Sequence, residues 1–344
     1  MLTPISHQLI DHYLGKADIN SYLKNTFIRE LYNSLSKNNY RNSKVRHYVE
    51  ERSFPTSDFM ANSIMDKIEM NDEVMTFVWT TTGKFPVRNT LHIYMKDIDD
   101  LPNTELLIRA ISFITAFSNK RRKITIHLCL LSDKKMMRKN QQRLTNLNVN
   151  SGSNRFSETS SEICIFRREE CLKVIFHEVL HGLRCSSLDH HSEITERLCL
   201  RYKLKSKDIL IDESYTETWA KIMNCFFISS LTTSSNKFQH FCTLLASEKE
   251  FSIYQANKIQ QFVKNSKDKN LDRETNVSAY YLVVGEIFSN LEQFLTMCNK
   301  NPYLKNHLEC FEYLYSLQKF PKKQVNVSDP FYSTLRMSVS ELKV

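Results

Sequence analysis

The spacing of hydrophobic residues changes along the chain, and each spacing predicts a different kind of element. Over residues 6–70, apolar residues recur mostly at helical intervals, with a break around residues 54–57 (FPTS). Strands are predicted where β-branched and aromatic residues cluster and partly alternate with polar ones. These segments are residues 73–81, 90–95, 123–131 and, shorter, 162–166. The helical spacing returns over residues 104–117, which predicts a helix there.

From residue 168 onward the apolar positions follow a helical period almost throughout. The predicted helices are residues 170–183, 192–202, 212–229, 237–247, 254–264, 278–297 and 304–317. A part that bears a sheet, followed by a helical part, predicts an α+β fold. We expect a helical N-terminal extension over residues 1–70, a sheet-bearing subdomain over 71–200 and a helical subdomain over 201–344. A cleft is expected at the boundary, near residues 185–205.

The composition is that of an ordinary globular protein, with 41% hydrophobic and 25% charged residues in 344. Only 5 residues are glycine, which argues against a glycine-rich phosphate-binding loop. No signal peptide is expected, because residues 1–20 contain no continuous apolar stretch. The most apolar segments, Leu282–Phe288 and Cys225–Leu231, are too short to span a bilayer, so no membrane span is expected.

The cysteines indicate a reducing compartment. There are 9 of them, an odd number, and they are scattered without any C-x-x-C pair. Most lie inside apolar runs, as Cys129, Cys164 and Cys199 do, which is typical of reduced core cysteines. We therefore expect the protein in the cytoplasm or nucleus.

The formal net charge is +9, and part of it is concentrated in one region. Lys120–Lys123 reads KRRK, and further cations follow at Lys134, Lys135, Arg138, Lys139 and Arg143. The favoured interpretation is a solvated edge and loop, since no nucleic-acid-binding motif accompanies the charge. A nucleic-acid partner is therefore not expected, although an acidic partner stays open as an alternative.

Residues 177–181 read His-Glu-Val-Leu-His, a pattern with a specific chemical use. On a helix, His177 and His181 lie one turn apart on the same face, so both imidazoles can bind one metal ion. Glu178 lies off that face, where it can accept a proton from a water that the metal activates. The surrounding residues are apolar and would bury the helix, and polar groups buried without partners cost several kcal/mol. A bound cation would satisfy them, whereas two hydrogen-bonded core histidines are the alternative.

A second polar pair follows on the helix predicted over residues 212–229. Glu213 and Glu217 are again four residues apart and share one face. Catalytic zinc takes three protein ligands and leaves the fourth position for water, so two histidines and one carboxylate complete the set. The other carboxylate can accept the N–H of a ligand imidazole. A solvated acidic face is the alternative, which the apolar neighbours Trp219 and Phe226 disfavour.

The chain resembles the gluzincin branch of the zincin metallopeptidases in two features taken together. These are the motif His177-Glu178-x-x-His181 and a glutamate on a downstream helix. The resemblance covers about residues 145–225. It implies a zincin-like α+β fold, with a small mixed sheet and the active-site helix in the N-terminal half, a helical C-terminal half and a cleft between them. It also implies that Glu213 is the third zinc ligand and that Glu217 supports the first histidine.

The same resemblance implies a substrate-binding edge strand upstream of the active-site helix. Residues 147–153 (LNVNSGS) stand in that place, so Asn148, Asn150 and Gly152 are the expected substrate-binding residues. This stretch also resembles uncharacterised His-Glu-x-x-His proteins of large DNA viruses, which would place the chain in the host cytoplasm or a virion.

The chain departs from the gluzincin pattern in two ways. Glu213 follows His181 by 32 positions, with an extra helix inserted, and Asp212 replaces the usual asparagine before the ligand. The metzincin pattern does not fit, because Arg184 and Ser187 stand where glycine and histidine would be needed. A set of polar residues beyond the helix offers an aspartate-ligand alternative, namely Asp189, His190 and His191.

A peptidase of this kind also needs a hydrogen-bond donor opposite the metal. Tyr280 and Tyr281 begin the long apolar segment 278–297 and are the leading candidates. We favour Tyr281, because it precedes Gly285 by one helical turn, where a small residue would leave the cleft open. Tyr215 is a weaker candidate.

The expected function is therefore zinc-dependent hydrolysis of peptide bonds in a peptide or protein substrate, with Glu178 as the general base. Two alternatives stay open. One is a catalytically silent binding protein of zincin fold, belonging to a virus or its host cell. The other is a nucleic-acid-associated protein that uses the basic segment.

Overall fold

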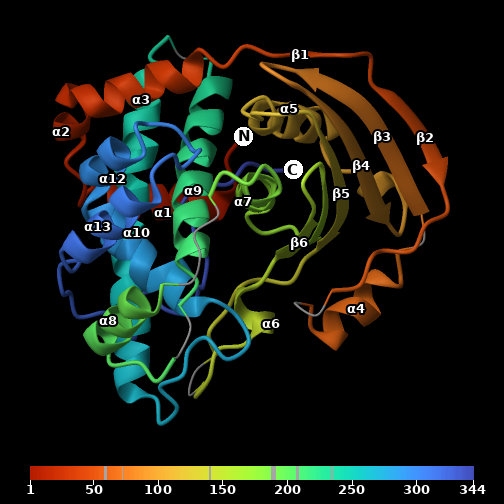
Figure 1. Ribbon diagram of the computed structural model, residues 1–344. Helices are drawn as coiled ribbons and strands as arrows, with labels where there is room; N and C mark the ends of the chain where they lie inside the picture. Colours follow the sequence, from red (N-terminus) through yellow and green to blue (C-terminus); the bar gives the residue numbers. More distant parts are fainter. Residues whose placement is uncertain (58–59, 72, 139–140, 187–190, 207–208, 234) are drawn as a thin grey trace.

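The protein is an α+β structure in which one mixed sheet lies against a body of helices (Figure 1). The computed structural model describes residues 1–344 except 58–59, 72, 139–140, 187–190, 207–208 and 234. Among the described residues, no helix combines the length and the apolar content needed to cross a membrane. All nine cysteines are described; each is buried and none forms a disulfide, as expected for reduced core cysteines.

The described strands form one seven-stranded sheet with the order β1-β3-β4-β5-β7-β6, and β2 also pairs with β3. Strands β4, β5 and β7 are mutually parallel, and the other pairings are antiparallel. The strands are β1 (Arg41–Asn42), β2 (Arg46–Glu50), β3 (Glu73–Thr82), β4 (Pro86–Met95), β5 (Arg122–Leu131), β6 (Gly152–Phe156) and β7 (Ser160–Arg167). The four strands predicted by hydrophobic alternation correspond to β3, β4, β5 and β7 and are confirmed.

Two other predictions about strands are wrong. Residues 41–50 were expected within a helical segment, but they form β1 and β2 on the edge of the sheet. The edge strand expected over residues 147–153 begins later, at Gly152, because residues before it form the short helix α6 (Asn146–Val149). The side chain of Asn148 causes this shift, since it accepts the backbone N–H of Thr145 at 3.0 Å and closes a helical turn.

Helices cover the inner face of the sheet. α5 (Thr104–Thr115) and α7 (Cys171–Gly182) pack on it directly, and α9 (Ile211–Leu231) packs against α7 (Figure 1). The remaining described helices are α1 (Pro4–Leu14), α2 (Ile19–Lys24), α3 (Thr26–Ser36), α4 (Asn62–Ile68), α8 (Ser192–Tyr202), α10 (Lys237–Asn265), α11 (Val284–Ser289), α12 (Leu291–Met297) and α13 (His307–Ser316). A 3₁₀ turn spans Ile98–Asp100, and a π-helical turn, Ser278–Val283, runs directly into α11.

The helical half contains two further differences from the sequence prediction. The helices expected over 237–247 and 254–264 are one continuous helix, α10. Polar residues at the expected break do not end it, because Glu248 is fully buried and pairs with Lys221 at 3.2 Å. The single helix expected over 278–297 is divided into the π-helical turn, α11 and α12.

The two ends of the described chain meet beside the start of α7. Leu2 and Leu342 form an isolated β-bridge, and α1 packs on α10. Leu9 and Tyr13 of α1 belong to the same hydrophobic core as the rest of the molecule. The helix α1 is therefore packed into the body of the protein.

Candidate metal centre

The centre is built on α7, a helix buried nearly all round. It begins after Glu170, which adopts a left-handed conformation (φ 61°) and donates its backbone N–H to Glu341 at 2.7 Å. Apolar residues of α7 pack between the sheet and the other helices, with Ile175 and Phe176 fully buried. The side of α7 that faces α9 carries polar residues four positions apart, so that their side chains align along one stripe.

Three side chains converge where this stripe meets the first turns of α9. The Nε2 atoms of His177 and His181 lie 3.2 Å apart. Glu213 Oε2 lies 3.1 Å from the first of these atoms and 3.2 Å from the second. Among the described residues, this is the group of three His, Cys, Asp or Glu whose ligand atoms come close enough to hold one metal ion. The structure thus brings the predicted ligands together.

The spacing of these atoms fits a zinc ion. In a tetrahedral site with bonds of about 2.0–2.1 Å, neighbouring ligand atoms lie about 3.3 Å apart. The three distances here, 3.1 to 3.2 Å, are close to that value. Two imidazole nitrogens and one carboxylate oxygen are also a common donor set of catalytic zinc sites.

The pKa values of these side chains are shifted by their mutual contacts. Although burial opposes the charged form of His177, hydrogen bonds to Glu213 and Glu217 raise its pKa to about 10. Burial likewise opposes the charged form of Glu213, yet the two histidines hold its pKa well below the usual range. The charged histidines and the carboxylate therefore stabilise one another, and a bound cation would displace protons from the histidines.

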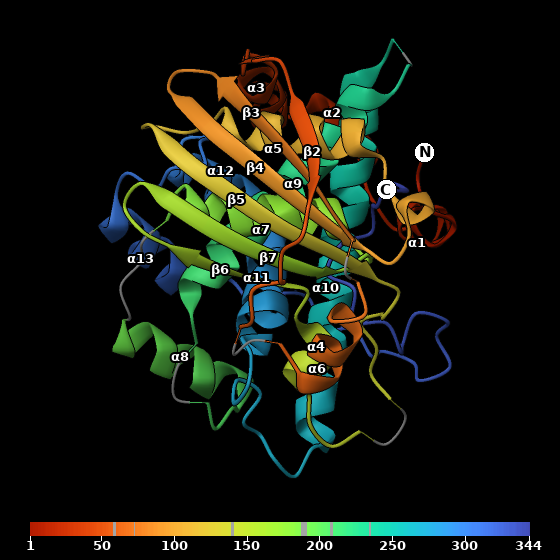
Figure 2. The ribbon, with the colours of Figure 1, turned by 90° about the vertical axis from the view of Figure 1, so that its right-hand side faces the viewer.

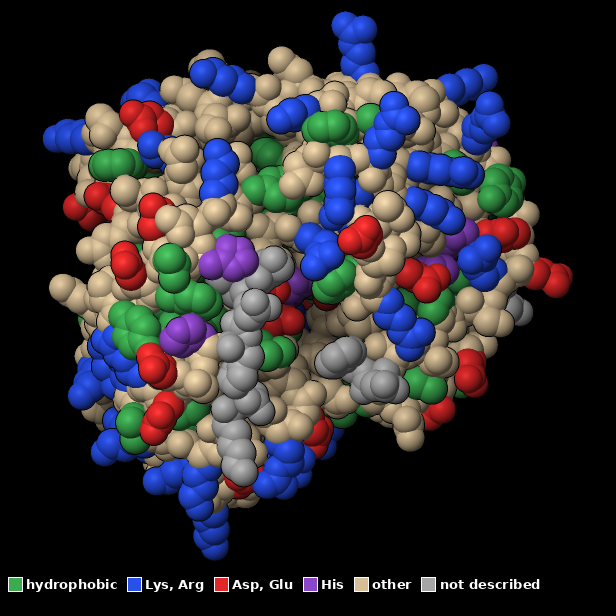
Figure 3. Space-filling model, viewed as in Figure 1, with side chains coloured by type: hydrophobic (Ala, Val, Ile, Leu, Met, Phe, Trp, Pro, Cys, Tyr) green, Lys and Arg blue, Asp and Glu red, His purple; other side chains and the backbone are tan. Residues whose placement is uncertain are grey.

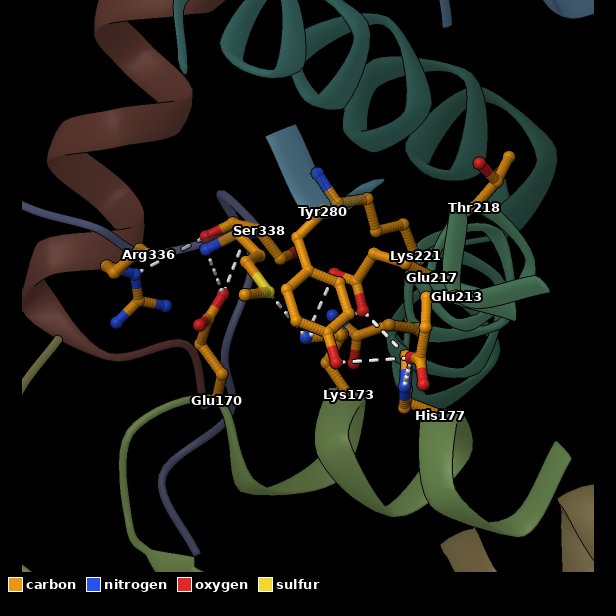
Figure 4. Close-up of polar contacts among 12 residues, drawn as sticks. Glu170, Lys173, His177, Glu213, Glu217, Thr218, Lys221, Tyr280, Arg336 and Ser338 are labelled. Carbon is orange, nitrogen blue, oxygen red and sulfur yellow. Dashed lines mark hydrogen bonds and ion pairs between the residues drawn. The ribbon is translucent and has the colours of Figure 1, made fainter. Parts of the chain in front are cut away.

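A second carboxylate orients the first histidine. Glu217, one turn after Glu213 on α9, is fully buried, and its Oε2 lies 2.9 Å from Nδ1 of His177 (Figure 4). The hydrogen bond between Nδ1 and Glu217 directs Nε2 toward the cluster, where it could bind a metal ion once the ring is neutral. On the other histidine, Nδ1 of His181 lies 3.6 Å from the carboxylate of Asp212.

Lys173 completes this arrangement, and the sequence analysis did not single it out. Its Nζ lies 2.9 and 3.0 Å from the two oxygens of Glu217 and 3.5 Å from the sulfur of Met337 (Figure 4). It stands four residues before His177, so it continues the polar stripe of α7. A lysine at that interval in an otherwise apolar helix is the sequence signal that could have revealed it.

Glu178 lies beside the cluster but outside it. Its side chain is buried among the walls of a small cavity of about 30 Å³. Burial raises the pKa of this carboxyl. The cavity is also lined by Gly152, where an added Cβ would stand 3.0 Å from Oε1 of Glu178. The lack of a side chain at residue 152 therefore makes room for the carboxylate.

The predicted substrate-binding residues lie in different surroundings. Asn150 and Gly152 line the cavity with Glu178, and the side chain of Asn150 accepts a hydrogen bond from Thr275. Asn148 does not line it, because its side chain is used within α6 and donates to the carbonyl of Met136. β6 is the outermost strand of the sheet, and it is antiparallel to β7.

The hydroxyl beside the cluster is that of Tyr280. It donates to Oε2 of Glu213 at 3.1 Å, and the tyrosine ring rests edge-on to His177 (Figure 4). Tyr281, which the sequence analysis favoured, points elsewhere and donates to the carbonyl of Leu335 at 2.6 Å. Tyr215 donates to the carbonyl of Pro302. The order of the two adjacent tyrosines is thus the reverse of the expected one.

The alternative ligands do not reach the cluster where the structure describes them. The ring of His191 packs against Phe311 with centroids 4.6 Å apart. Asp189 and His190 lie outside the described residues.

Comparisons of the chain with protein-family models, with curated proteins and with solved structures found no match. Function is therefore inferred from the site itself.

Proposed function

We propose that the protein is a zinc-dependent peptidase that holds the ion on His177, His181 and Glu213. The observation that carries this proposal is the convergence of three ligand atoms at 3.1 to 3.2 Å, with a fourth polar group, Glu178, buried beside them. Helices of unrelated function rarely bury two histidines and three carboxylates together, because unpaired polar groups inside a protein are costly.

Each residue has a role that its position supports. Zinc, when bound, would supply Lewis-acid chemistry, lowering the pKa of a water and polarising the scissile carbonyl. Glu178 is the proposed general base, which accepts a proton from the attacking water and passes it to the leaving amine. Its burial, which raises its pKa, brings that group closer to the range suited to proton transfer at neutral pH. Glu217 orients His177, and Tyr280 is the proposed donor to the developing oxyanion.

The outer strand β6 is the proposed guide for the substrate. An extended peptide can add to the edge of a sheet through backbone hydrogen bonds, and β6 ends the sheet next to Glu178. The cavity at the site is about 30 Å³, which is room for one or two waters at about 10–15 Å³ each. A peptide would therefore require the walls to part, including the contact between Asn150 and Thr275.

The test is metal analysis joined to peptide cleavage. Purified protein should contain about one zinc per chain and cleave members of an unbiased peptide library, and a chelator should abolish cleavage. Glu178→Gln should keep the metal and the melting temperature while turnover falls at least about a hundredfold, since an amide cannot accept the proton. Equal turnover by Glu178→Gln would remove Glu178 from this role.

A second candidate is a catalytically silent protein of zincin fold that binds a partner in a virus or its host cell. The small volume of the cavity that described residues form beside Glu178, about 30 Å³, favours this candidate. This candidate predicts stoichiometric zinc without cleavage of any library member, and wild-type behaviour of Glu178→Gln in partner capture. The resemblance to viral proteins is compatible with either candidate, and so is a place in the host cytoplasm or a virion.

A further inference from the structure

The outer face of the sheet is open over much of its area. Figure 2 views this face directly, with the helical body behind it. α4 covers one end, where residues such as Met60 and Ile64 pack over Tyr94 and Phe166. The other end, near the turn between β3 and β4, has no helix over it among the described residues (Figure 2).

Four cations project from that open end. Because successive side chains of a strand point to opposite faces, the strand register shows which residues share the outer face. Arg88 pairs directly with Lys123 on the neighbouring strand, and Thr80 and Ser160 extend the same row on either side. Arg46 of β2 and Arg41 of β1 pair with Val78 and Thr82, which lie on the same face of β3. We call Arg41, Arg46, Arg88 and Lys123 the basic face.

No ion pair with another described residue neutralises the charge of the basic face. All four side chains are exposed, and none forms an ion pair with a described residue. The nearest carboxylate in the strand register is that of Glu162, which pairs with Thr125, one outward-facing position beyond Lys123. It contacts His127 at 3.2 Å. Lys and Arg side chains also gather over the upper right of the molecule in Figure 3, on the sheet side. The net charge of +9 is thus partly collected on one surface.

The basic segment noted in the sequence contributes only part of this surface. Lys123 and Arg121 are exposed, but Arg122 points into the core. Lys135 is buried against Glu170 at 2.9 Å, and Arg143 pairs with Glu274. The surface is formed instead by strands far apart in the sequence, which is why the segment alone did not predict it.

We propose that the basic face binds duplex nucleic acid through its phosphate backbone. With strands about 4.8 Å apart and a rise of about 3.4 Å per residue, the four cations span roughly 14 by 13 Å. A duplex presents about one phosphate per 1.7 Å of its axis, so this area meets several phosphates at once. Partly exposed hydroxyls lie between the cations, on Thr80, Thr90, Thr125 and Ser160. Arginine, lysine, serine and threonine are the side chains that commonly contact phosphate.

The chemistry of the face favours a duplex over other acidic partners. Binding of single strands relies on successive exposed rings for base stacking, and Tyr48 is the one exposed aromatic that faces outward near the basic face among the described strand residues. A protein partner would need an apolar interface core, whereas this part of the face is built of threonines and cations. This binding activity is separate from the proposed peptidase and does not depend on it.

The experiment measures binding of the zinc-loaded full chain to a fluorescently labelled 20-base-pair duplex of mixed sequence. With four phosphate contacts, log K should fall with log salt at a slope of about −3.6, or about 150-fold between 50 and 200 mM salt. Arg88→Glu with Lys123→Glu should weaken binding at least about tenfold and reduce the slope to about −1.8. The matched control reverses two exposed lysines on helices, Lys24 of α2 and Lys264 of α10, and Lys24→Glu with Lys264→Glu should bind as the parent does.

Melting temperature and zinc content should be unchanged in both double variants, since all four residues are exposed. The proposal is overturned if the parent shows no binding at 50 mM salt, or if the control weakens binding as much as the basic-face variant. It is also overturned if vesicles containing phosphatidylserine, or polyglutamate, bind more tightly than the duplex and lose affinity on the same substitutions. That result would assign the surface to a membrane or to an acidic protein.

Discussion

At the scale of single residues, the centre depends on one buried carboxylate that two cationic groups share. Glu217 contacts Nζ of Lys173 and Nδ1 of His177 at 2.9 Å each. Burial alone would raise the pKa of Glu217, but Lys173 and His177 lower it, so the carboxylate stays ionised inside the protein. The orientation of the first histidine therefore relies on a lysine that touches neither the proposed metal nor the base.

Removing the charge of either Lys173 or Glu217 alone should lower the free energy of unfolding much more than removing both charges together. Lys173→Met leaves Glu217 with a single cationic partner, and breaking a buried ion pair typically costs about 3–5 kcal/mol. In the double variant Lys173→Met with Glu217→Gln no buried charge is stranded, so the loss should be clearly smaller. Urea unfolding of the two single variants and the double variant gives the coupling energy. If the stability losses of the two single variants add up to that of the double variant, the contact between Lys173 and Glu217 contributes no coupling energy.

Even the addition of one methyl group at Gly152 should lower the proposed peptidase activity. An added Cβ would stand 3.0 Å from both the carbonyl of Cys164 and Oε1 of Glu178, so Glu178 must move. Overpacking of this kind costs about 1–3 kcal/mol, and a base displaced by about 1 Å can lower a rate a hundredfold. Gly152→Ala should therefore cut peptidase turnover about tenfold or more while zinc content stays unchanged. Gly15→Ala is the control, since nothing lies within 4 Å of an added Cβ there; equal rates in both would contradict the prediction.

At the scale of elements, the π-helical turn decides which tyrosine reaches the cluster. A π turn adds one residue per turn relative to an α-helix and so rotates the side chains that precede α11. In an uninterrupted α-helix, as the sequence predicts, Tyr281 would lie one regular turn before Gly285. In the structure Tyr280 reaches Glu213, and the hydroxyl of Tyr281 is bound to Leu335. Hydrophobic spacing cannot reveal this rotation, because both faces of the segment are apolar.

The two tyrosines provide a matched pair of tests. Tyr280→Phe removes a hydroxyl beside the proposed metal, so the maximal peptidase rate should fall about tenfold or more with little change in the melting temperature. Tyr281→Phe leaves the buried carbonyl of Leu335 without its donor, which should cost about 1–3 kcal/mol of stability and leave the rate unchanged. Steady-state kinetics and thermal unfolding of both variants check this. If Tyr281→Phe lowered the rate and Tyr280→Phe did not, Tyr281 would be the donor instead.

Elements with strong local patterns were predictable from the sequence, and elements set by single side chains were not. The spacing of His177 and His181, and of Glu213 and Glu217, follows directly from helix geometry and led to the cluster that the structure shows. The strand expected over 147–153 was misplaced because the side chain of Asn148 accepts the backbone N–H of Thr145 and closes a helical turn there. Such a bond leaves no periodic signal in the sequence.

Another buried polar group lies on the outer side of the sheet, at the end covered by α4. His127 stacks on His92 at 4.8 Å, and its Nδ1 lies 2.9 Å from the hydroxyl of Tyr94. Burial, with His92 and Arg52, lowers the pKa of His127 to about 3, so the folded protein keeps this ring neutral. In the unfolded chain a histidine titrates near pH 6.5.

This histidine should make the protein less stable in acid. As the pH falls below about 6.5, the unfolded chain binds a proton that the folded state excludes, so stability falls by up to about 1.4 kcal/mol per pH unit until about pH 3. Between pH 7 and pH 5, the free energy of unfolding of His127→Gln should fall by about 2 kcal/mol less than that of the parent. Urea unfolding at both pH values measures it, with the exposed His7→Gln as control. An unchanged loss in His127→Gln would contradict the prediction.

At the scale of the whole molecule, the centre joins two parts of the chain. Two of its proposed ligands come from α7, which packs on the sheet, and the third comes from α9 in the helical body (Figure 1). The C-terminal residues bind the same region, since Glu170 before α7 accepts the backbone N–H of Met337 at 2.9 Å. The buried position of the site therefore results from contacts among α7, α9 and the C-terminal residues.

Because the proposed ligands lie on two packed helices, zinc should stabilise the whole fold. A ligand that binds only the folded state adds RT ln(1 + [L]/Kd), or about 4 kcal/mol when free zinc exceeds Kd a thousandfold. Chelation should thus lower the denaturant midpoint of the parent, and returning zinc should restore it. His181→Ala should show little response, because it lacks one ligand, whereas the exposed His7→Gln should respond as the parent does. A zinc response retained in full by His181→Ala would place the metal elsewhere in the chain.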